Sequence, residues 1–476
     1  HYSFVRQFPR TLTRRSLTSM STDEKKKRSW PRLILRWTIQ FIVVVVVLGS
    51  IAFAVMFRGA LYNRFYLFPK QAAAWKQIAE SRQEVTLDDG WTEYRGVCHS
   101  HSELSHDCEV KPPDILRAAK IADIKFICMT DHAREGKADY STGWKGDREG
   151  VLFVRGFELD HGFMPWGLPD DTVLTSDTHY TQMAEQIASK GGVLFYAHSE
   201  EVDQRDWELP QLNGMEIYNI HTDVKDEGEV EAFLKNIAVD LMLSLNKYPD
   251  QAFRLLFDRQ TAILDHWDEL NKTRKVVGIA ASDAHQNSGF RGTYTEDGKL
   301  IVRDTGPDKG RNKSISLNFF TRGLLRMFCG PLEPGTQVFR IEMDKYDRSL
   351  RFVNTHILAR GLTEPDVIDA LRIGRVFVAF DMLADARGFT YLAEGAGAKA
   401  VMGEEVSVQS GLTLRAASPV HCRFTLKRDG QQLDQREGRT FEYSAKEPGN
   451  YRIEAELNIL GEWTPWVYTN PIRIKP

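Results

Sequence analysis

The chain has 476 residues, of which 27% are charged, and a formal net charge of −3. This length allows about two or three domains, or one large barrel with an appendage. Residues 1–37 carry a net charge of +8 and residues 58–76 a net charge of +4, which leaves −15 for the rest of the chain. Such an acidic main body argues against nucleic-acid binding, which needs a basic surface.

Residues 38–57 contain no charged residue. As a helix that rises about 1.5 Å per residue, they would span the roughly 30 Å hydrocarbon core of a bilayer. We therefore expect a basic cytoplasmic tail over 1–37, a transmembrane helix over 38–57 and a neck over 58–91. The larger positive charge precedes the helix, which predicts a cytoplasmic N-terminus and an extracytoplasmic main body, periplasmic in a Gram-negative cell.

A cleavable signal peptide is the alternative interpretation of the same segment. Ala52-Phe53-Ala54 resembles a cleavage site with small flanking residues. However, the apolar run is longer than a usual signal-peptide core, which favours an uncleaved anchor. Met20 lies just before the basic run and is a plausible start residue.

The main body alternates between predicted strands and predicted helices. The strands are expected at 95–101, 123–129, 151–157, 192–197, 215–220 and 275–280, and the helices at 112–122, 177–189, 226–246 and 250–272. Strands that alternate with helices predict a parallel sheet, and this number of repeats predicts a barrel.

Histidines and acids gather at the ends of these predicted strands. In an extended strand His99 and His101 would point to the same side, and Asp107 follows after a short turn. The other residues of this kind are His132, Glu158, His198, His221, Asp283 and His285. A parallel barrel assembles its active site at the carboxyl ends of its strands. Imidazole and carboxylate ligands suit zinc, iron and manganese alike, so we expect a metal site.

These motifs resemble those of the PHP (polymerase and histidinol phosphatase) superfamily of metal-dependent hydrolases. The matching segments are His99-Ser100-His101 with Asp107, Thr130-Asp131-His132, Glu158, His198 and Asp283-Ala284-His285. The resemblance implies a distorted (β/α)7 TIM-like barrel over residues 92–385 with two or three divalent ions. It also implies that Glu158 bridges two of them, and His221 is a weaker match to a further ligand.

The sequence gives less information about substrate recognition. Arg134 and Arg291 each follow a motif and are candidates to bind a phosphate or carboxylate, although a surface arginine is an equally good interpretation. Residues 286–315 are polar and glycine-rich, which predicts a long loop that either covers the mouth of the site or is simply solvated.

The C-terminal part shows a different pattern. Strands are expected at 336–342, 350–357 and 374–380, with a helix over 363–372 whose N-cap is Thr363. From residue 388 short alternating runs with turns predict a small all-β, Ig-like sandwich over 386–476. The last residues, from Trp463 onward, resemble the end of PHP proteins that carry such a sandwich, including the carbaryl-hydrolase-like branch.

The five cysteines do not pair evenly. Cys98 and Cys108 flank the first motif and could form a disulfide in an oxidising compartment. Cys98 fits better as a buried strand residue that points away from the two histidines.

The sequence thus predicts a membrane-anchored, metal-dependent hydrolase, with phosphoester hydrolysis as the leading reaction. Hydrolysis of a carboxyl ester, amide or carbamate is the first alternative, and a non-catalytic, metal-holding binding protein is the second. The expected partners are a small-molecule or phosphoester substrate and the membrane, with no nucleic acid. Nothing in the sequence indicates the oligomeric state.

Overall fold

The computed structural model describes residues 22–476, apart from 86, 203–204, 221–239, 241–242, 258, 304, 308–312, 343, 396 and 409–410. His221, Met20 and most of the helix expected over 226–246 lie outside the described residues. The chain divides into two compact units, His1–Leu61 and Tyr62–Pro476.

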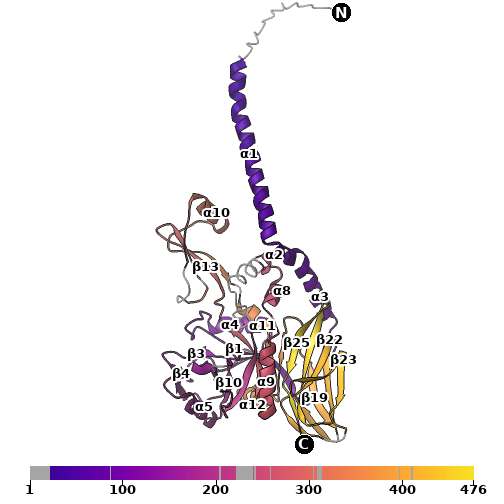
Figure 1. Cartoon of the computed structure of the whole chain (residues 1–476). Helices are drawn as coiled ribbons and strands as arrows, with labels where there is room; N and C mark the ends of the chain where they lie inside the picture. The colour runs from indigo at the N-terminus through magenta and orange to yellow at the C-terminus, as the bar shows by residue number, and fades with distance from the viewer. Residues whose placement is uncertain are drawn as a thin grey trace, which may run out of the picture. The chain divides into compact units, whose positions relative to one another are not determined.

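The first unit is dominated by one long helix, α1 (Thr22–Met56), drawn at the N-terminal end of Figure 1. Its segment Arg32–Met56 has 25 residues, and the most apolar 18-residue stretch within it has a mean hydropathy of 2.7. By length and composition alone, this segment could cross a membrane.

The second unit contains a large sheet of parallel and antiparallel strands, built around β1 (Thr92–Ser100). The strand β1 pairs in parallel with β2 on one side and with β12 on the other (Figure 1). The parallel series continues from β2 to β6, and from β12 through β11 to β10. These strands are β2 (Phe126–Cys128), β6 (Val151–Val154), β10 (Val193–Tyr196), β11 (Leu212–Asn219) and β12 (Val277–Ala284). Each strand expected between residues 95 and 280 overlaps β1 or one of these five strands.

Short strands flank this sheet. The strand β8 (Phe163–Trp166) runs antiparallel to β10, and a bridge joins Trp166 to Gly156 just after β6. The strand β5 (Gly146–Arg148) runs antiparallel to β6. Two separate two-stranded sheets are formed by β3 (Asp131–His132) with β7 (Phe157–Glu158), in parallel, and by β4 (Lys137–Asp139) with β9 (Val173–Thr175), antiparallel.

The helices follow the apolar periodicity of the sequence. The helices α4 (Pro112–Ile121), α5 (Tyr180–Ser189) and α12 (Glu364–Ile373) lie where helices were expected. The Thr363 side chain accepts a hydrogen bond from the Asp366 N–H, so the predicted N-cap is confirmed. The neck contains α2 (Arg58–Tyr62), a π-helical turn (Asn63–Leu67) and α3 (Phe68–Glu80).

Two expectations about regular elements are wrong in detail. The segment expected as one helix over 250–272 is divided into α8 (Pro249–Phe253), a 3-10 turn and α9 (Thr261–Thr273). The strand expected over 350–357 begins instead as α11 (Tyr346–Phe352), and β17 (Asn354–Ala359) follows. In α11, Tyr346, Ser349 and Leu350 are buried at helical spacing, and this pattern outweighs the short apolar run.

The expectation of a long loop over 286–315 is also wrong, because this region contains three strands. The strands β13 (Gly289–Tyr294), β14 (Lys299–Arg303) and β15 (Lys313–Ser316) form an antiparallel sheet with β16 (Gln337–Glu342). We call Gly289–Glu342 the insertion; it also contains α10 (Phe319–Cys329). Its strands are rich in polar side chains because most of the sheet is only partly buried, so the usual apolar signal of a strand is weak.

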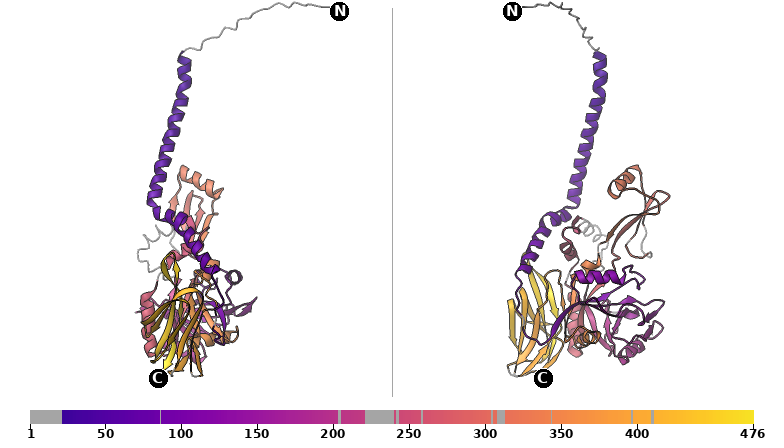
Figure 2. Two further views of the ribbon diagram at one scale, coloured as in Figure 1. Left: turned by 90° about the vertical axis from the view of Figure 1, so that its right-hand side faces the viewer. Right: turned by 180° about the vertical axis from the view of Figure 1, so that it is seen from behind.

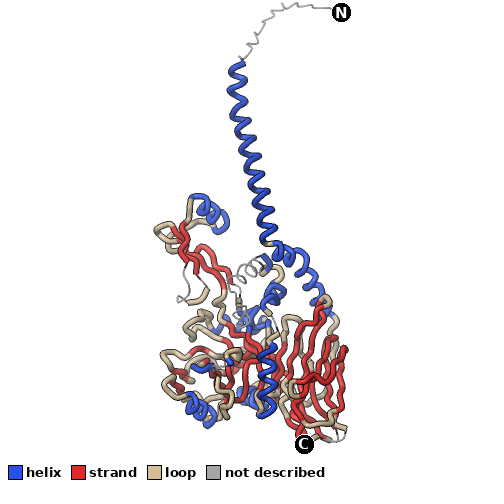
Figure 3. Tube along the Cα trace, in the orientation of Figure 1, coloured by secondary structure: helices blue, strands red, loops and turns tan. Residues whose placement is uncertain are grey.

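The described residues from Thr390 to Lys475 form strands joined by turns, which Figure 3 shows in red and tan. Long antiparallel pairs join β22 (Thr413–Arg428) to β23 (Gln431–Ser444) and to β24 (Gly449–Ile459). The first hairpin turns at Asp429 and Gly430, whose φ angles are 49° and 85°. Asp-Gly with two positive φ angles is the turn that the sequence predicts there. The shorter strands are β19 (Thr390–Gly395), β20 (Ala398–Val401), β21 (Glu405–Ser407), β25 (Glu462–Thr469) and β26 (Ile472–Lys475). Strand β18 (Val376–Ala379) precedes them and pairs antiparallel with β25.

Buried polar contacts fix the C-terminal strands against the parallel sheet. The Arg452 guanidinium on β24 donates to both carboxylate oxygens of Asp268 on α9, at 2.6 Å each. The Asn470 side chain accepts from the Gly278 N–H and donates to the Gly278 carbonyl on β12, at 2.9 Å each. The right-hand view of Figure 2 shows the C-terminal strands beside the rest of this unit. Strand β12 is therefore held from behind by the C-terminal residues.

The possible disulfide between Cys98 and Cys108 is not formed, because both cysteines are free. Cys98 is buried in the sheet opposite Cys128 of β2. The Cys108 sulfur lies 3.7 Å from the Tyr346 hydroxyl. Cys98 is thus a core residue, as its strand position suggested.

A buried ion cluster at the start of β1 gives a pH-dependent test of stability. His356 on β17 is fully buried, with Nδ1 2.6 Å from Glu93 and Nε2 2.7 Å from Asp381. Burial disfavours the imidazolium, but the two carboxylates outweigh burial and raise the pKa of His356 from 6.5 to about 9. Its stabilising contribution is complete below about pH 6.5 and is lost as the pH rises through about 9.

Over that pH range we expect the free energy of unfolding to fall by about 3 kcal/mol more in the native chain than in His356→Gln. His356→Gln should also be less stable at pH 6.5. Urea unfolding at a series of pH values, followed by near-ultraviolet circular dichroism, measures both. Parallel pH profiles for the two proteins would contradict the assignment of a charged His356.

Candidate metal centre

The backbone bends sharply where the main sheet delivers its functional side chains. His99, His198 and Asp283 have φ angles of 63°, 51° and 45°. Non-glycine residues rarely adopt this left-handed region, and such strain concentrates at functional sites. The pairing of β1 with β12 shifts register between Cys98 and Ser100. His99 therefore does not sit on a regular extended strand, and a bulge rather than simple alternation brings it beside His101.

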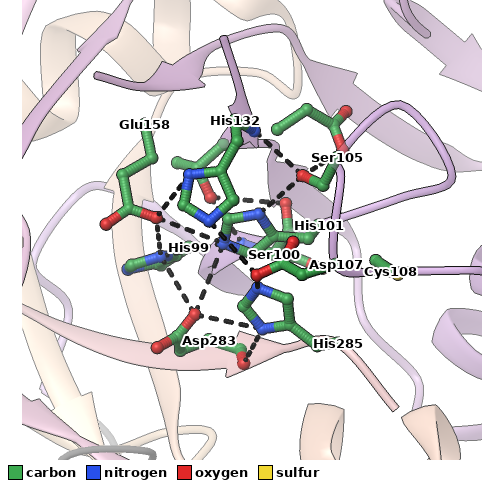
Figure 4. Close-up of polar contacts among 12 residues, drawn as sticks. His99, Ser100, His101, Ser105, Asp107, Cys108, His132, Glu158, Asp283 and His285 are labelled. Carbon is green, nitrogen blue, oxygen red and sulfur yellow. Dashed lines mark hydrogen bonds and ion pairs between the residues drawn. The ribbon is translucent and has the colours of Figure 1, made fainter. Parts of the chain in front are cut away.

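Four buried side chains meet at the centre of this site (Figure 4). The His99 Nε2 atom lies 3.1 Å from His101 Nε2, 3.2 Å from Glu158 Oε2 and 3.1 Å from Asp283 Oδ1. The His101 Nε2 atom lies 3.5 Å from the same Glu158 oxygen and 3.3 Å from the same Asp283 oxygen. Two imidazole nitrogens and two carboxylate oxygens thus face one small volume.

The spacing of these atoms fits a metal ion. Ligand atoms about 2.0–2.2 Å from one tetrahedral zinc ion lie about 3.3–3.6 Å from one another. The separations of 3.1–3.5 Å between His99, His101, Glu158 and Asp283 are close to that range. The donor set is also the one that borderline divalent cations prefer.

Two further ligand groups overlap the first. His101, Asp107, His132 and His285 form one of them, with Asp107 Oδ2 3.4 Å from His132 Nε2 and 3.3 Å from His285 Nε2. His99, His198 and Asp283 form the other. Glu158 connects the groups, since its Oε1 lies 3.2 Å from His198 and its Oε2 3.6 Å from His132.

The outer nitrogens of the histidines have acceptors that set the ring orientation. The Nδ1 atom of His99 lies 2.5 Å from Glu216, and that of His285 lies 2.9 Å from the Asp283 carbonyl oxygen. His101 Nδ1 lies 2.9 Å from the Ser105 hydroxyl, which in turn donates to Asp131. When each Nδ1–H donates outward, each Nε2 lone pair faces the centre, which is the arrangement of metal-ligating histidines.

Sequence reasoning missed Glu216 as a functional residue. Its carboxylate is buried on β11 and also accepts hydrogen bonds from the His198 N–H at 2.8 Å and from the Asn219 amide at 2.9 Å. One signal was present, since Glu216 is an acid in an otherwise apolar strand, Met215-Glu-Ile-Tyr. Asp131 belongs to a motif, but the sequence assigned it no role. Its carboxylate accepts a hydrogen bond from the Ser102 N–H at 2.5 Å.

The carboxylates dominate the electrostatics of the site. Burial disfavours the charged form of His198, but hydrogen bonds to Glu158 and Glu200 outweigh it and raise the pKa of His198 to about 10. Burial likewise disfavours the charged form of His285, yet Asp283 and Asp107 raise its pKa to about 8. Burial, together with His285, lowers the pKa of His101 to about 3. A cluster that binds protons this tightly at two histidines offers the same negative field to a metal cation.

The predicted site residues fall into three sets. His99, His101, Asp107, His132, Glu158, His198, Asp283 and His285 come together in the ligand groups. His221 lies outside the described residues. Arg134 and Arg291 belong to none of the ligand groups. Arg134 donates to the Leu104 carbonyl at 2.5 Å, and Arg291 donates to the Gly306 carbonyl at 2.5 Å. Both arginines hold loops in this structure, and their predicted role in substrate binding stays a prediction.

No protein-family model matches the chain, and no curated protein matches it significantly. One similar solved structure is a two-domain protein from Bacteroides vulgatus ATCC 8482 that contains a predicted PHP-like metal-dependent phosphoesterase. The identity is 12%, the match covers 82% of this chain and 98% of that chain, and the TM-score is 0.35. A TM-score this low does not establish a shared fold, so the case for a metal centre rests on the side chains described above.

Replacing Glu216 tests whether the acceptor of a histidine Nδ1–H orients that histidine for metal binding. Glu216→Gln removes the charged acceptor of His99 Nδ1–H, and we expect about 10–100-fold weaker metal binding with the fold retained. Titration of the metal-free protein with Zn²⁺ or Mn²⁺ against a competing chelator measures the affinity. Glu208→Gln is the matched control, because the Glu208 side chain is exposed. Equal affinities for the two variants would show that Glu216 does not orient a ligand.

Proposed function

We propose that the chain is a membrane-anchored, metal-dependent hydrolase of the PHP type, and that phosphoesters are its main substrates. The observation that carries the proposal is the sharing of ligands: His99 and His101 each belong to two ligand groups, and Glu158 reaches several histidines with both oxygens. Shared ligands favour two or three adjacent ions over one. Zinc, manganese and iron all suit this donor set.

The proposed ligands are His99, His101, Asp107, His132, Glu158, His198, Asp283 and His285, with His221 as a further candidate. Divalent ions bound there would lower the pKa of water and stabilise negative charge on a phosphoryl group. The chain's own residues would hold these ions in fixed geometry and keep water out of the inner part, where His99 and His101 have no exposed surface. This chemistry requires no nucleophilic serine or cysteine.

The outer ligands mark the side from which a substrate would approach. The side chains of His132 and Asp107 are 26% and 31% exposed, whereas those of His99 and His101 are fully buried. A phosphate or carboxyl group that enters from solvent would therefore meet the group around Asp107 and His132 first. Arg134 and Arg291 remain the candidates for binding the rest of the substrate.

We further propose that residues 92–385 form the distorted (β/α)7 barrel of the PHP superfamily and residues 386–476 an Ig-like sandwich. The order of parallel strands from β6 to β10 supports a barrel, as does the bridge between Gly156 and Trp166, which brings the two ends of that order together through β8. The antiparallel strands after Thr390 support the sandwich. The carbaryl-hydrolase-like branch is the proposed relative because of the C-terminal segment from Trp463 onward.

The decisive experiment is turnover by the metal-loaded chain and by an Asp283 variant. Phosphomonoesters, phosphodiesters, carboxyl esters and carbamates are offered after loading with zinc, manganese or iron. We expect phosphoester turnover, and Asp283→Asn should reduce kcat by at least about 10³-fold, since loss of about 4 kcal/mol of transition-state stabilisation has that effect. The exposed Asp171→Asn is the matched control.

Each result of this experiment has a clear meaning. Turnover of carboxyl esters or carbamates alone would replace the phosphoesterase proposal with the alternative hydrolase. Stoichiometric metal without any turnover would favour a binding protein. A loss of fold in Asp283→Asn, seen by circular dichroism, would refute a purely catalytic role for this residue.

We propose that Arg32–Met56 anchors the chain with its N-terminus in the cytoplasm and its hydrolase part outside. The basic residues before this segment support that orientation. A protease added outside intact cells should digest the hydrolase part, and the same digestion after detergent lysis is the control. Protection of the hydrolase part in intact cells but not in lysates would refute the orientation.

A further inference from the structure

The helix α10 of the insertion is both apolar and basic. Six of the eleven residues from Phe319 to Cys329 are Phe, Leu or Met, and its charged residues are Arg322 and Arg326. The preceding strand β15 adds Lys313, so residues 313–329 contain three basic residues and no acidic residue. This composition differs from the acidic main body of the chain.

One face of α10 is turned toward the β-sheet of the insertion. The Arg322 guanidinium lies 6.0 Å from the centre of the Tyr294 ring, and its Nη2 is 3.5 Å from the Gly298 carbonyl oxygen. Leu325 and Cys329, which follow Arg322 at helical spacing, are half-buried on the same side. The sheet therefore takes the side of the helix that carries Arg322, whereas the Arg326 side chain is exposed.

Large apolar side chains are exposed at the start of α10 and on β15. The Phe319 side chain is 96% exposed, and that of Ile315, four residues earlier on β15, is 39% exposed. The insertion extends away from β1 and β10, with α10 at its far end, in Figures 1 and 2.

These features select one kind of partner. Exposed large apolar side chains usually mark a binding surface. An apolar helix flanked only by basic residues is the pattern of helices that lie in the interface of an anionic bilayer. The charge fits acidic lipid head groups, and the apolar residues fit the boundary of the acyl region.

We propose that α10 and β15 dock on the surface of an anionic lipid bilayer, with Phe319 and Ile315 in the interface and Lys313 and Arg326 on lipid head groups. The inference rests on the proposed function in one respect, since Arg32–Met56 would hold the chain at a bilayer. The insertion starts four residues after the proposed ligand His285. Docking would thus fix the orientation of the metal site relative to the membrane.

The test uses the full chain in nanodiscs of phosphatidylcholine, with and without phosphatidylglycerol. Hydrogen exchange of residues 313–329 should be at least about fivefold slower with the anionic lipid, because each basic residue near such a surface contributes roughly that factor. The variant Phe319→Asp/Arg326→Glu should lose this slowing. The control Leu460→Asp/Arg117→Glu changes two residues that are 53% and 69% exposed elsewhere, and it should keep the slowing.

Equal exchange in the two nanodiscs for the native chain would overturn the proposal, as would an unchanged lipid effect in the Phe319→Asp/Arg326→Glu variant. If that variant disturbs the helix, the salt dependence of exchange in the native chain tests the proposal instead. About 1 M salt should reduce the lipid-dependent slowing of exchange, because screening shortens the range of the charges. A lipid effect that salt leaves unchanged would also contradict docking on head groups.

The outcome is separable from that of the proposed function. Exchange needs no turnover, so an inactive chain with lipid-dependent slowing would refute only the hydrolase. A chain that does not enter nanodiscs would refute the anchoring, and α10 would then be tested by sedimentation of the same chain with vesicles of the two compositions.

Discussion

The structure depends on the burial of His99 among three carboxylates. His99 has no exposed surface and faces Glu158, Glu216 and Asp283. Burying ionisable groups is costly unless each is paired and hydrogen-bonded. Here every partner comes from a different strand, so the cluster is stable only when several distant segments of the chain are in register. The same requirement makes the cluster a rigid frame for a cation.

Strain and support occur at the same residues. His99, His198 and Asp283 adopt left-handed backbone conformations, which cost roughly 1–3 kcal/mol each and persist only where the surroundings enforce them. The Glu216 carboxylate supplies part of that support, because it binds the His99 ring and the His198 backbone together. The ligand geometry is therefore a property of the folded sheet rather than of the short motifs.

The C-terminal strands contribute to this frame without reaching it. Asn470 fills the hydrogen-bonding capacity of Gly278 at the beginning of β12, and Arg452 forms a buried ion pair with Asp268 on α9. Strand β12 ends at Asp283 and Ala284, so its position behind the site is set from the far end of the chain. This coupling gives the all-β part a structural role in positioning the ligands.

The sequence by itself predicted most of the strands, several of the helices, the histidines and acids that come together in one cluster, and the uncharged segment 38–57, because periodicity and residue chemistry are local properties. It did not identify Glu216, since the role of this residue appears only when β11 lies beside β12, which in turn pairs with β1. It also misjudged the insertion, whose strands are too exposed to show an apolar pattern. The structure alone decided that Arg134 and Arg291 bind loop carbonyls, that Cys98 and Cys108 stay apart, and that a bulge rather than strand alternation aims His99. Those outcomes depend on contacts between residues far apart in the chain.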